Sequence, residues 1–187
     1  MGDVLYSMNV SLDGFVEDAD GNIEWASVDD ELHTFFNDQV RAMGAFLYGR
    51  RMYELMVGAW PHWDEQPGVS AVEADFAKIW RPKPKVVFSK TLQSAEWNSR
   101  IVRENLPAAV LQLKSEFEGP LGVGGPGIAA SLIELGLIDV FEPVVHPVVL
   151  GGGKAFWPAE IPNMPLVLEE TRPFRSGAVA MRYRRRA

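Results

Sequence analysis

The stretch LGVGGPGIAA, residues 121–130, is the most informative part of the sequence for the fold. An apolar run over residues 120–123 leads into glycines, and the glycines open an apolar run over residues 127–135 with helical spacing. Gly136 follows at the position where glycine commonly ends a helix. The stretch therefore predicts a strand, a tight turn and a helix, which is a building unit of α/β proteins.

The glycine turn between this strand and this helix is suited to binding an anion. The first N–H groups of a helix have no partner within the helix, and the helix dipole is positive at that end. Without side chains, a pyrophosphate can approach the backbone closely. Gly124, Gly125, Pro126 and Gly127 exceed what a bare turn requires, so we expect a ligand here. A tight turn without a ligand is the alternative.

The same glycines spell G-x-G-x-x-G, but the context is not that of a Rossmann fingerprint. That fingerprint belongs to the first βαβ unit of a fold and is followed about 20 residues later by an acidic residue. Here the motif opens the last predicted helix, and Asp139 and Glu142 lie too close to serve.

Outward from this stretch, strand patterns alternate with helix patterns. Strands are expected at residues 4–10, 45–48, 85–89, 120–123 and 140–150. Helices are expected at residues 29–43, 51–57, 70–80, 105–116 and 127–135, the first with Ser27 as N-cap. Residues 11–24 and 58–68 are expected to form loops. Residues 166–171 and 178–183 flank Ser176-Gly177 and predict a β-hairpin. The predicted fold is α/β: a mixed, mostly parallel sheet with helices on both faces and a C-terminal antiparallel hairpin. No linker or repeat divides the chain, so residues 1–187 are expected to form one domain.

Two further strand ends are suited to phosphate. Gly49 ends one strand and starts a helix with Arg50 and Arg51, whose forked guanidinium groups match phosphate oxygens. Ser89 and Lys90 follow the next strand. Ligands of open α/β sheets bind outside the carboxyl ends of the strands, so a dinucleotide with an extra 2′-phosphate would contact all three places. A solvated strand end is the alternative for either one alone.

Composition excludes several classes of protein. Of 187 residues, 47% are hydrophobic, enough for a core, and the net charge of −7 argues against a nucleic-acid partner. There is no cysteine, and the three histidines lack ligand spacing, so we expect no disulfide and no zinc site. Carboxylates could still bind a hard cation, but we assign no metal ligand. Without a signal segment or an apolar run of about 18 residues, no membrane association and a cytoplasmic location are expected.

Short motifs along nearly the whole chain carry a family resemblance. They are SLDG at residues 11–14, GRRMYE at 49–54, VFSKT at 87–91, GGPG at 124–127, LID at 137–139 and HPVVLGGG at 146–153. With these motifs in this order, the chain resembles the dihydrofolate-reductase-like superfamily, most closely the branch that contains the reductase domain of riboflavin biosynthesis.

The resemblance implies a three-layer αβα fold with an eight-stranded mixed sheet, NADPH as the hydride donor and frequently a homodimer. It places Arg50, Ser89 and Lys90 at the adenosine 2′-phosphate, and Gly49, Arg51 and Met52 at the phosphates. The pyrophosphate would lie on the glycine turn, that is, on Gly124, Gly125, Pro126, Gly127 and Ile128. Met52 departs from the family pattern, which usually has a threonine hydroxyl there.

The substrate side is less clearly marked. A reductase delivers a proton as well as a hydride, often from a buried carboxylic acid. Trp25, expected at the substrate, precedes Asp30 and Glu31, which are the two candidate proton donors at the start of a predicted helix. Acids in a first helical turn are also favoured by the dipole alone. Asp13 either contacts substrate or stabilises its own turn.

The resemblance thus implies an NADPH-dependent reductase that acts on a C=N or C=O of a pyrimidine- or pteridine-like heterocycle. The most similar named activity is 5-amino-6-(5-phosphoribosylamino)uracil reductase of riboflavin biosynthesis, and dihydrofolate reductase is the alternative. A non-catalytic NADPH-binding sensor on the same fold is an alternative of a different class. The zinc deaminase that accompanies some riboflavin reductases needs cysteines, which this chain lacks.

Overall fold

The protein, described over residues 2–161 and 163–186 in a computed structural model, is built on an eight-stranded sheet of order β5-β4-β3-β6-β1-β7-β10-β9. The strands are β1 (Val4–Ser11), β3 (Ala45–Gly49), β4 (Lys85–Phe88), β5 (Ser99–Val102), β6 (Leu121–Gly124), β7 (Val140–His146), β9 (Leu166–Pro173) and β10 (Val179–Arg185). A separate ribbon pairs β2 (Phe15–Glu17) with β8 (Lys154–Ala155). The helical segments are α1 (Asp30–Ala42), α2 (Arg50–Ala59), η1 (Trp63–Glu65), α3 (Ala71–Trp80), α4 (Leu106–Glu116) and α5 (Pro126–Glu134).

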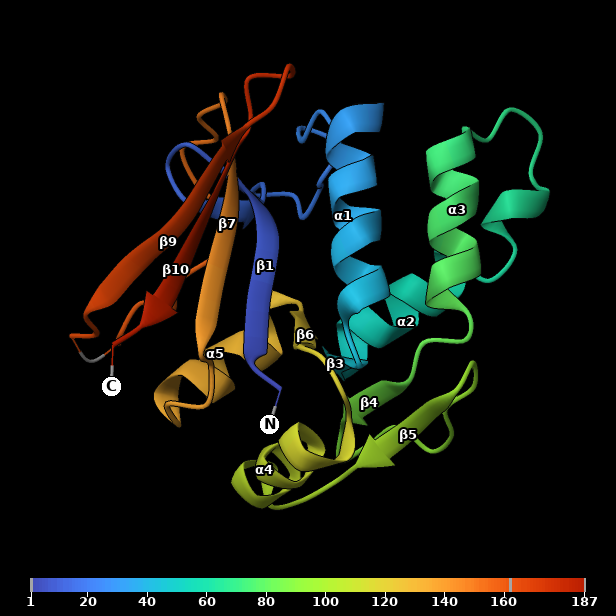
Figure 1. Cartoon of the computed structure of the whole chain (residues 1–187), viewed down its shortest axis with the longest axis vertical. Coiled ribbons are helices and arrows are strands. Elements are labelled where there is room, and N and C mark those ends of the chain that lie inside the picture. Colours follow the sequence, from blue (N-terminus) through green and yellow to red (C-terminus); the bar gives the residue numbers. More distant parts are fainter. Residues whose placement is uncertain (1, 162, 187) are drawn as a thin grey trace.

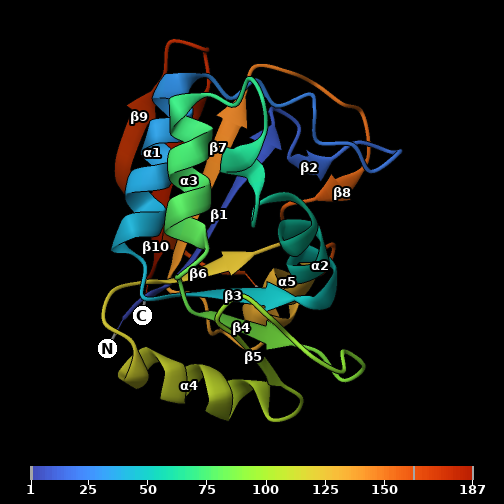
Figure 2. The same cartoon turned by 90° about the vertical axis from the view of Figure 1, so that its right-hand side faces the viewer.

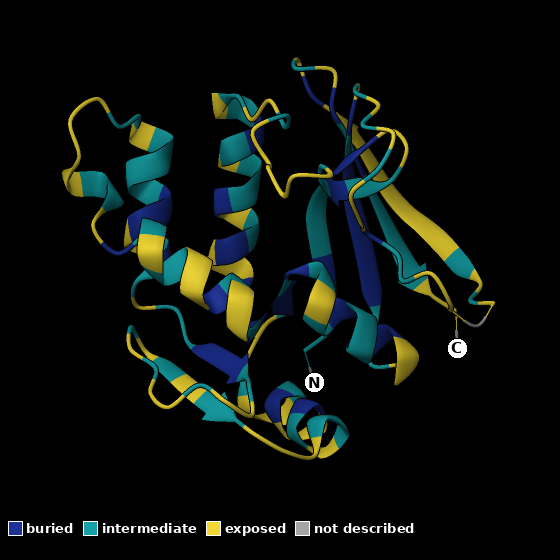
Figure 3. Ribbon diagram, turned by 180° about the vertical axis from the view of Figure 1, so that it is seen from behind, coloured by how far each residue is buried: buried dark blue, intermediate teal, exposed yellow. Residues whose placement is uncertain are grey.

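The strands from β5 to β7 run parallel, and β10 and β9 are added antiparallel at one edge, which confirms the predicted mixed sheet and hairpin. Helices cover both faces (Figures 1 and 2). Side chains of α1, α2 and α3 pack on one face, and side chains of α4 and α5 pack on the other. The central strands β4, β3, β6, β1 and β7 between these layers are largely buried (Figure 3). The three-layer α/β fold is therefore confirmed.

The parallel strands bring the predicted motifs to one edge of the sheet. β3 pairs with both β4 and β6, so Gly49, Phe88 and Gly124 end neighbouring strands. The helices α2 and α5 start at this same edge, directly after β3 and β6. This edge is where an open α/β sheet presents its ligand site.

Several boundaries differ from the predictions. The strands β2, β5 and β8 were not predicted, because runs of two to four residues carry little periodicity. β7 ends at His146 rather than at Leu150, since Pro147 has no N–H for a ladder. α1 begins after Asp29, whose carboxylate accepts from Leu32 N at 2.9 Å, so the prediction of Ser27 as N-cap is wrong.

A buried lysine joins the turn between α3 and β4 to the segment that leads into β5. Lys85 is 1% exposed, and its ammonium donates to the backbone oxygens of Trp80, Arg81, Lys83 and Trp97 at 2.7–3.2 Å. Burial lowers its pKa to about 7. Trp97 has a positive φ of 58°, so the lysine fixes a strained turn at the amino ends of β4 and β5, on the edge of the sheet opposite the predicted phosphate edge.

No helix within residues 2–161 and 163–186 is both long enough and apolar enough to span a bilayer.

Candidate functional site

A cleft of about 430 Å³ lies at the carboxyl ends of β3 and β6. The residues around it that the sequence had singled out are Gly49, Arg50, Arg51, Met52, Gly124, Gly125, Pro126, Gly127 and Ile128. They come from two strand-to-helix turns more than 70 positions apart, so the fold assembles them at one place. Glu17, Leu55, Phe88, Ser131 and Lys154 complete the lining.

The surroundings of the glycines in this turn show which of them the fold requires and which it does not. A Cβ on Gly124 would lie 2.4 Å from the Tyr48 ring, and Gly125 has a φ of +96°, so the fold itself requires both. A Cβ on Gly127 would meet nothing within 4 Å, and its φ lies outside the left-handed region. Gly127 is thus not required by internal packing, and its bare backbone is open to a ligand.

The α-helix starts at this cleft differ from the other α-helix starts in the described chain. Side chains of Asp29, Ser70 and Asn105 cap α1, α3 and α4. α2 and α5 begin at Gly49 and Gly125, with no side-chain cap and no acid in the first turn. Two sets of first-turn N–H groups therefore face the cleft without an internal side-chain acceptor, an arrangement that favours an anion.

The arginines that start α2 already have partners. Arg50 donates through Nε to Glu54 Oε1 at 2.7 Å and through Nη1 to Thr91 Oγ1 at 3.0 Å. Arg51 donates to Glu17 Oε2 at 2.9 Å. Both guanidinium groups are at least half exposed and line the cleft. Their charges are therefore available to a ligand that exchanges with these surface partners.

A second hollow of about 460 Å³ continues the cleft beyond Phe88, which lines both. Ser89 and Lys90 line it, and their contact with the far end of a dinucleotide stays a prediction. The Ser89 hydroxyl accepts from Thr91 N at 3.3 Å and Leu92 N at 3.0 Å, so it also holds the turn. Glu104, Asn105 and Leu106 form the side toward α4.

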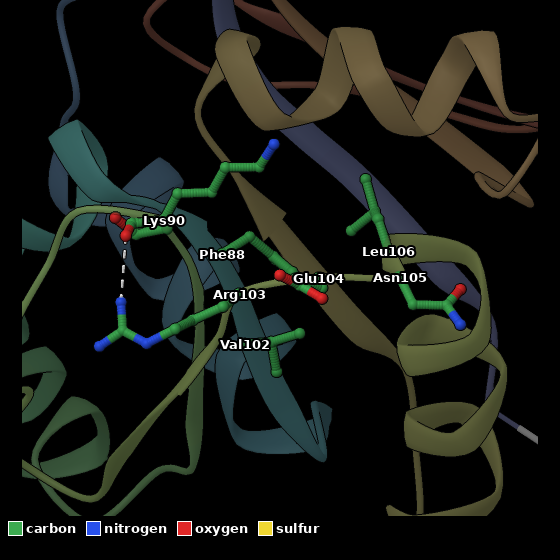
Figure 4. A pocket seen from close by; sticks show the side chains of 8 residues that line it. Phe88, Lys90, Val102, Arg103, Glu104, Asn105 and Leu106 are labelled. Carbon is green, nitrogen blue, oxygen red and sulfur yellow. Dashed lines mark hydrogen bonds between the residues drawn. The ribbon is translucent and has the colours of Figure 1, made fainter.

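Sequence reasoning missed Arg103, which lines this second hollow. It follows β5, and its guanidinium donates to Lys90 O at 3.2 Å and Leu92 O at 2.8 Å. Figure 4 shows Arg103 bonded to the Lys90 backbone, with Phe88 and Val102 close to it. The run SRIV at residues 99–102 is the signal that could have revealed β5 and hence Arg103.

Asp13 links two loops at the ends of β1 and β7. Its carboxylate accepts from Ser11 Oγ at 2.7 Å, Leu150 N at 3.1 Å and Gly151 N at 2.7 Å. The Ser11 hydroxyl, with these backbone N–H groups, lowers the Asp13 pKa to about 2. Both carboxylate oxygens are engaged within the fold, which gives Asp13 a loop-holding role; contact with a substrate stays a prediction.

The candidate proton donors do not line either hollow. Asp30 is exposed, and within the described residues no hydrogen bond reaches its carboxylate. Glu31 Oε2 accepts from Arg175 N at 3.1 Å, in the tip of the hairpin between β9 and β10. The expectation of a buried carboxylic acid thus has no counterpart at this helix start among Asp29, Asp30 and Glu31. Whether Asp30 or Glu31 donates a proton stays a prediction.

Trp25 lies over the end of β7 rather than against the glycine turn. Its ring meets His146 edge-on at 5.7 Å, and Trp25 Nε1 is buried with no partner among the described residues. His146 is 2% exposed and pairs with Asn9 Oδ1 at 2.9 Å, and burial lowers its pKa. This polar group at the ends of β1 and β7 was not singled out from the sequence.

The fold and the cleft define a dihydrofolate-reductase-like α/β protein, and comparisons place it more narrowly. The pattern of the RibD C-terminal domain family matches residues 3–180. The chain therefore belongs to the RibD C-terminal domain family. A relative from Bacillus subtilis (strain 168), the uncharacterized protein YyaP, is 30% identical over 181 residues, covering 96% of this chain and 93% of that protein.

Solved structures agree on the fold. A protein assigned to riboflavin biosynthesis from Shewanella sp. PV-4 superposes with a TM-score of 0.78 at 17% identity over 100% of both chains. A deaminase/5-amino-6-(5-phosphoribosylamino)uracil reductase from Thermotoga maritima has a TM-score of 0.67 at 14% identity over 99% of this chain and 57% of that one. Dihydrofolate reductase from Enterococcus faecalis, complexed with NADP(H), has a TM-score of 0.65 at 15% identity over 100% of this chain and 98% of that one. Family and neighbours together support a reductase-like role.

Proposed function

We propose that this protein is an NADPH-dependent reductase that binds the cofactor along the carboxyl ends of β6, β3, β4 and β5. The observation that carries the proposal is the pair of helix starts at Gly49 and Gly125, which lack side-chain caps and face one cleft with two arginines. The other α-helices of the described chain satisfy part of their first N–H groups with their own side chains.

The residues around the cleft fit a dinucleotide phosphate. The N–H groups of Gly125, Gly127 and Ile128 would hold the pyrophosphate, since Pro126 has no N–H, and the open space at Gly127 lets it approach. Arg50, Ser89 and Lys90 would hold the 2′-phosphate, with Arg103 fixing the Lys90 backbone. Met52 packs beside Gly124 and Gly125, so at this position the backbone, not a hydroxyl, serves the phosphates.

NADPH, when bound, supplies a hydride. The substrate we propose is a pyrimidine- or pteridine-like heterocycle with a reducible C=N or C=O. Asp30 is the better candidate for proton delivery, because the Glu31 carboxylate is engaged by the hairpin tip. Asp13 keeps the adjoining loops in place through the Leu150 and Gly151 N–H groups.

Within this class, the reaction we favour is that of 5-amino-6-(5-phosphoribosylamino)uracil reductase, because family membership covers residues 3–180. Dihydrofolate reduction is the second candidate, favoured by the likeness to a dihydrofolate reductase over the whole chain. A non-catalytic NADPH-binding sensor is the candidate of a different class, favoured by the lack of a buried acid among the three at the α1 start. A homodimer belongs to the proposal, and the exposed outer strand β9 offers it a surface.

The test is thermal unfolding with saturating NADPH, with NADH and without nucleotide. A ligand at 100 times its Kd adds about 2.7 kcal/mol, roughly 5–10 °C for a chain of this size. We expect a larger shift with NADPH than with NADH. Equal shifts would remove the 2′-phosphate assignment, and no shift would contradict cofactor binding. NADPH oxidation assays with both named substrates then separate the two reactions, and absence of turnover with NADPH bound would favour the sensor.

A further inference from the structure

The small ribbon of β2 and β8 forms one wall of the cleft. β2 has three residues and β8 has two, and their pairing is irregular between Phe15 and Glu17. Figure 2 shows the two strands side by side. Glu17 stands opposite Lys154 in this register, and both line the cleft with the glycine turn. So short a two-stranded pairing has little stability of its own, which makes the ribbon the most easily moved wall of the cleft.

An ion pair crosses from this ribbon to the start of α2. Glu17 Oε2 accepts from Arg51 Nη2 at 2.9 Å, and the two residues are 34 positions apart. The Glu17 side chain is only 18% exposed, whereas that of Arg51 is 72% exposed, so the carboxylate is the partner held within the cleft wall. A Cβ on Gly21 would lie 3.7 Å from Arg51 and 3.9 Å from Glu17, so the loop after β2 lies beside the pair.

Glu17 differs in charge from the other ionisable residues that line the cleft. Among the described residues that line it, the cations are Arg50, Arg51 and Lys154, and Glu17 is the one acid. A carboxylate beside two anion-binding helix starts opposes the charge that the site is built to take. Its contact with Arg51 neutralises a cation that a pyrophosphate would otherwise use.

Building on the proposed cofactor site, we propose that Glu17 is an electrostatic gate: its carboxylate holds Arg51 until the dinucleotide pyrophosphate replaces it. Binding exchanges one partner of Arg51 for another, frees the ribbon from α2 and leaves Lys154 as a further cation at the anion. The gate lowers affinity for any ligand with a pyrophosphate, whether or not it carries a 2′-phosphate.

The test compares Glu17→Gln with wild type by tryptophan-fluorescence titration with NADPH and with NADH. Because an exposed ion pair contributes at most about 1 kcal/mol, we expect up to fivefold tighter binding of both nucleotides. Glu116→Gln is the matched control, since it breaks a similar surface pair with Arg100, 2.7 Å apart and away from the cleft, and should change nothing. Limited proteolysis without nucleotide should cut the loop at residues 18–24 faster in Glu17→Gln.

A double-mutant cycle identifies the route of the effect. In an Arg51→Gln background, Glu17→Gln should give a smaller gain in affinity than in wild type, because the cation it releases is gone and only its direct repulsion of the anion is relieved. Unchanged or weaker binding by Glu17→Gln, with wild type binding NADPH normally, overturns the gate and leaves the proposed function intact. Wild-type protein that binds neither nucleotide overturns both.

Discussion

The starts of α5 and α1 have the same positive dipole end but differ in what lies there: a side-chain cap and acids at α1, and neither at α5. α5 begins at Gly125 with no side-chain cap and no acid in its first turn. α1 begins at Asp29, which caps it, and carries Asp30 and Glu31 in its first turn. In α1 the chain's own carboxylates stabilise the positive end of the helix, whereas in α5 that end is left for a ligand.

This difference shows how to separate a binding helix start from a structural one. Glycine at a helix start is ambiguous, since a turn also needs it. The glycine indicates a ligand only where its missing side chain leaves open space, as at Gly127, and not where packing fills the space, as at Gly124. An acid in a first turn is equally ambiguous until its partners are known, and the partner of Glu31 comes from the distant hairpin.

The largest expected effect comes from a substitution that blocks the start of α5. Gly127→Leu should weaken NADPH binding by more than about 100-fold, or 2.7 kcal/mol, because a side chain would fill the path of the pyrophosphate. Its melting temperature without nucleotide should change little, since nothing lies within 4 Å of the added Cβ. Fluorescence titration and thermal unfolding measure the two effects.

Gly58→Leu is the matched control for this substitution. Gly58 also has nothing within 4 Å of an added Cβ, and it lies in α2 outside the lining of the cleft. Its nucleotide affinity should equal that of wild type. Tight NADPH binding by Gly127→Leu would mean that the α5 start is a bare turn.

The second prediction distinguishes the roles of the two acids in the first turn of α1. Asp30→Asn should lower kcat by about 100-fold while NADPH affinity is unchanged, because general acid catalysis contributes about 10²–10⁴-fold. Glu31→Gln should keep kcat within about threefold and lose about 1 kcal/mol of stability, since it weakens the bond to Arg175 N. Steady-state kinetics with the substrate found by the NADPH oxidation assays, together with thermal unfolding, make the comparison. Loss of rate in Glu31→Gln alone would reverse the two roles.

The comparison also shows which parts of the molecule the sequence can predict. The glycine turn, the α2 start and the order of the parallel strands were predictable, because glycine, arginine and apolar periodicity act over a few residues. Glu17 and Lys154 were not, since they reach the cleft from strands of three and two residues that have no clear pattern. Arg103, which lines the second hollow, follows the short run SRIV, the one local signal of β5. The contact between Arg175 and Glu31 spans 144 positions, so no local signal could indicate it.

The smallest expected effect concerns Asp13, which joins the loops that follow the two central strands β1 and β7. Its folded-state pKa of about 2 lies below the ordinary value of 3.8, so its carboxylate stabilises the fold above that value. This stabilisation is lost as the pH falls through about 2. Asp13→Asn should therefore melt below wild type at pH 5, and the gap should narrow steadily toward pH 2.

Thermal unfolding at half-unit pH steps measures the gap, and two further variants locate its origin. Ser11→Ala removes the donor at 2.7 Å that contributes most to the shift, so the loss of stability between pH 5 and pH 2 should be smaller in this variant and should end at a higher pH than in wild type. Asp20→Asn, an exposed acid in the loop after β2, should run parallel to wild type throughout. A constant gap between Asp13→Asn and wild type from pH 5 to pH 2 would mean that the carboxylate does not hold the Leu150 and Gly151 loop. Asp13 would then return to the substrate side of the cleft as a candidate contact.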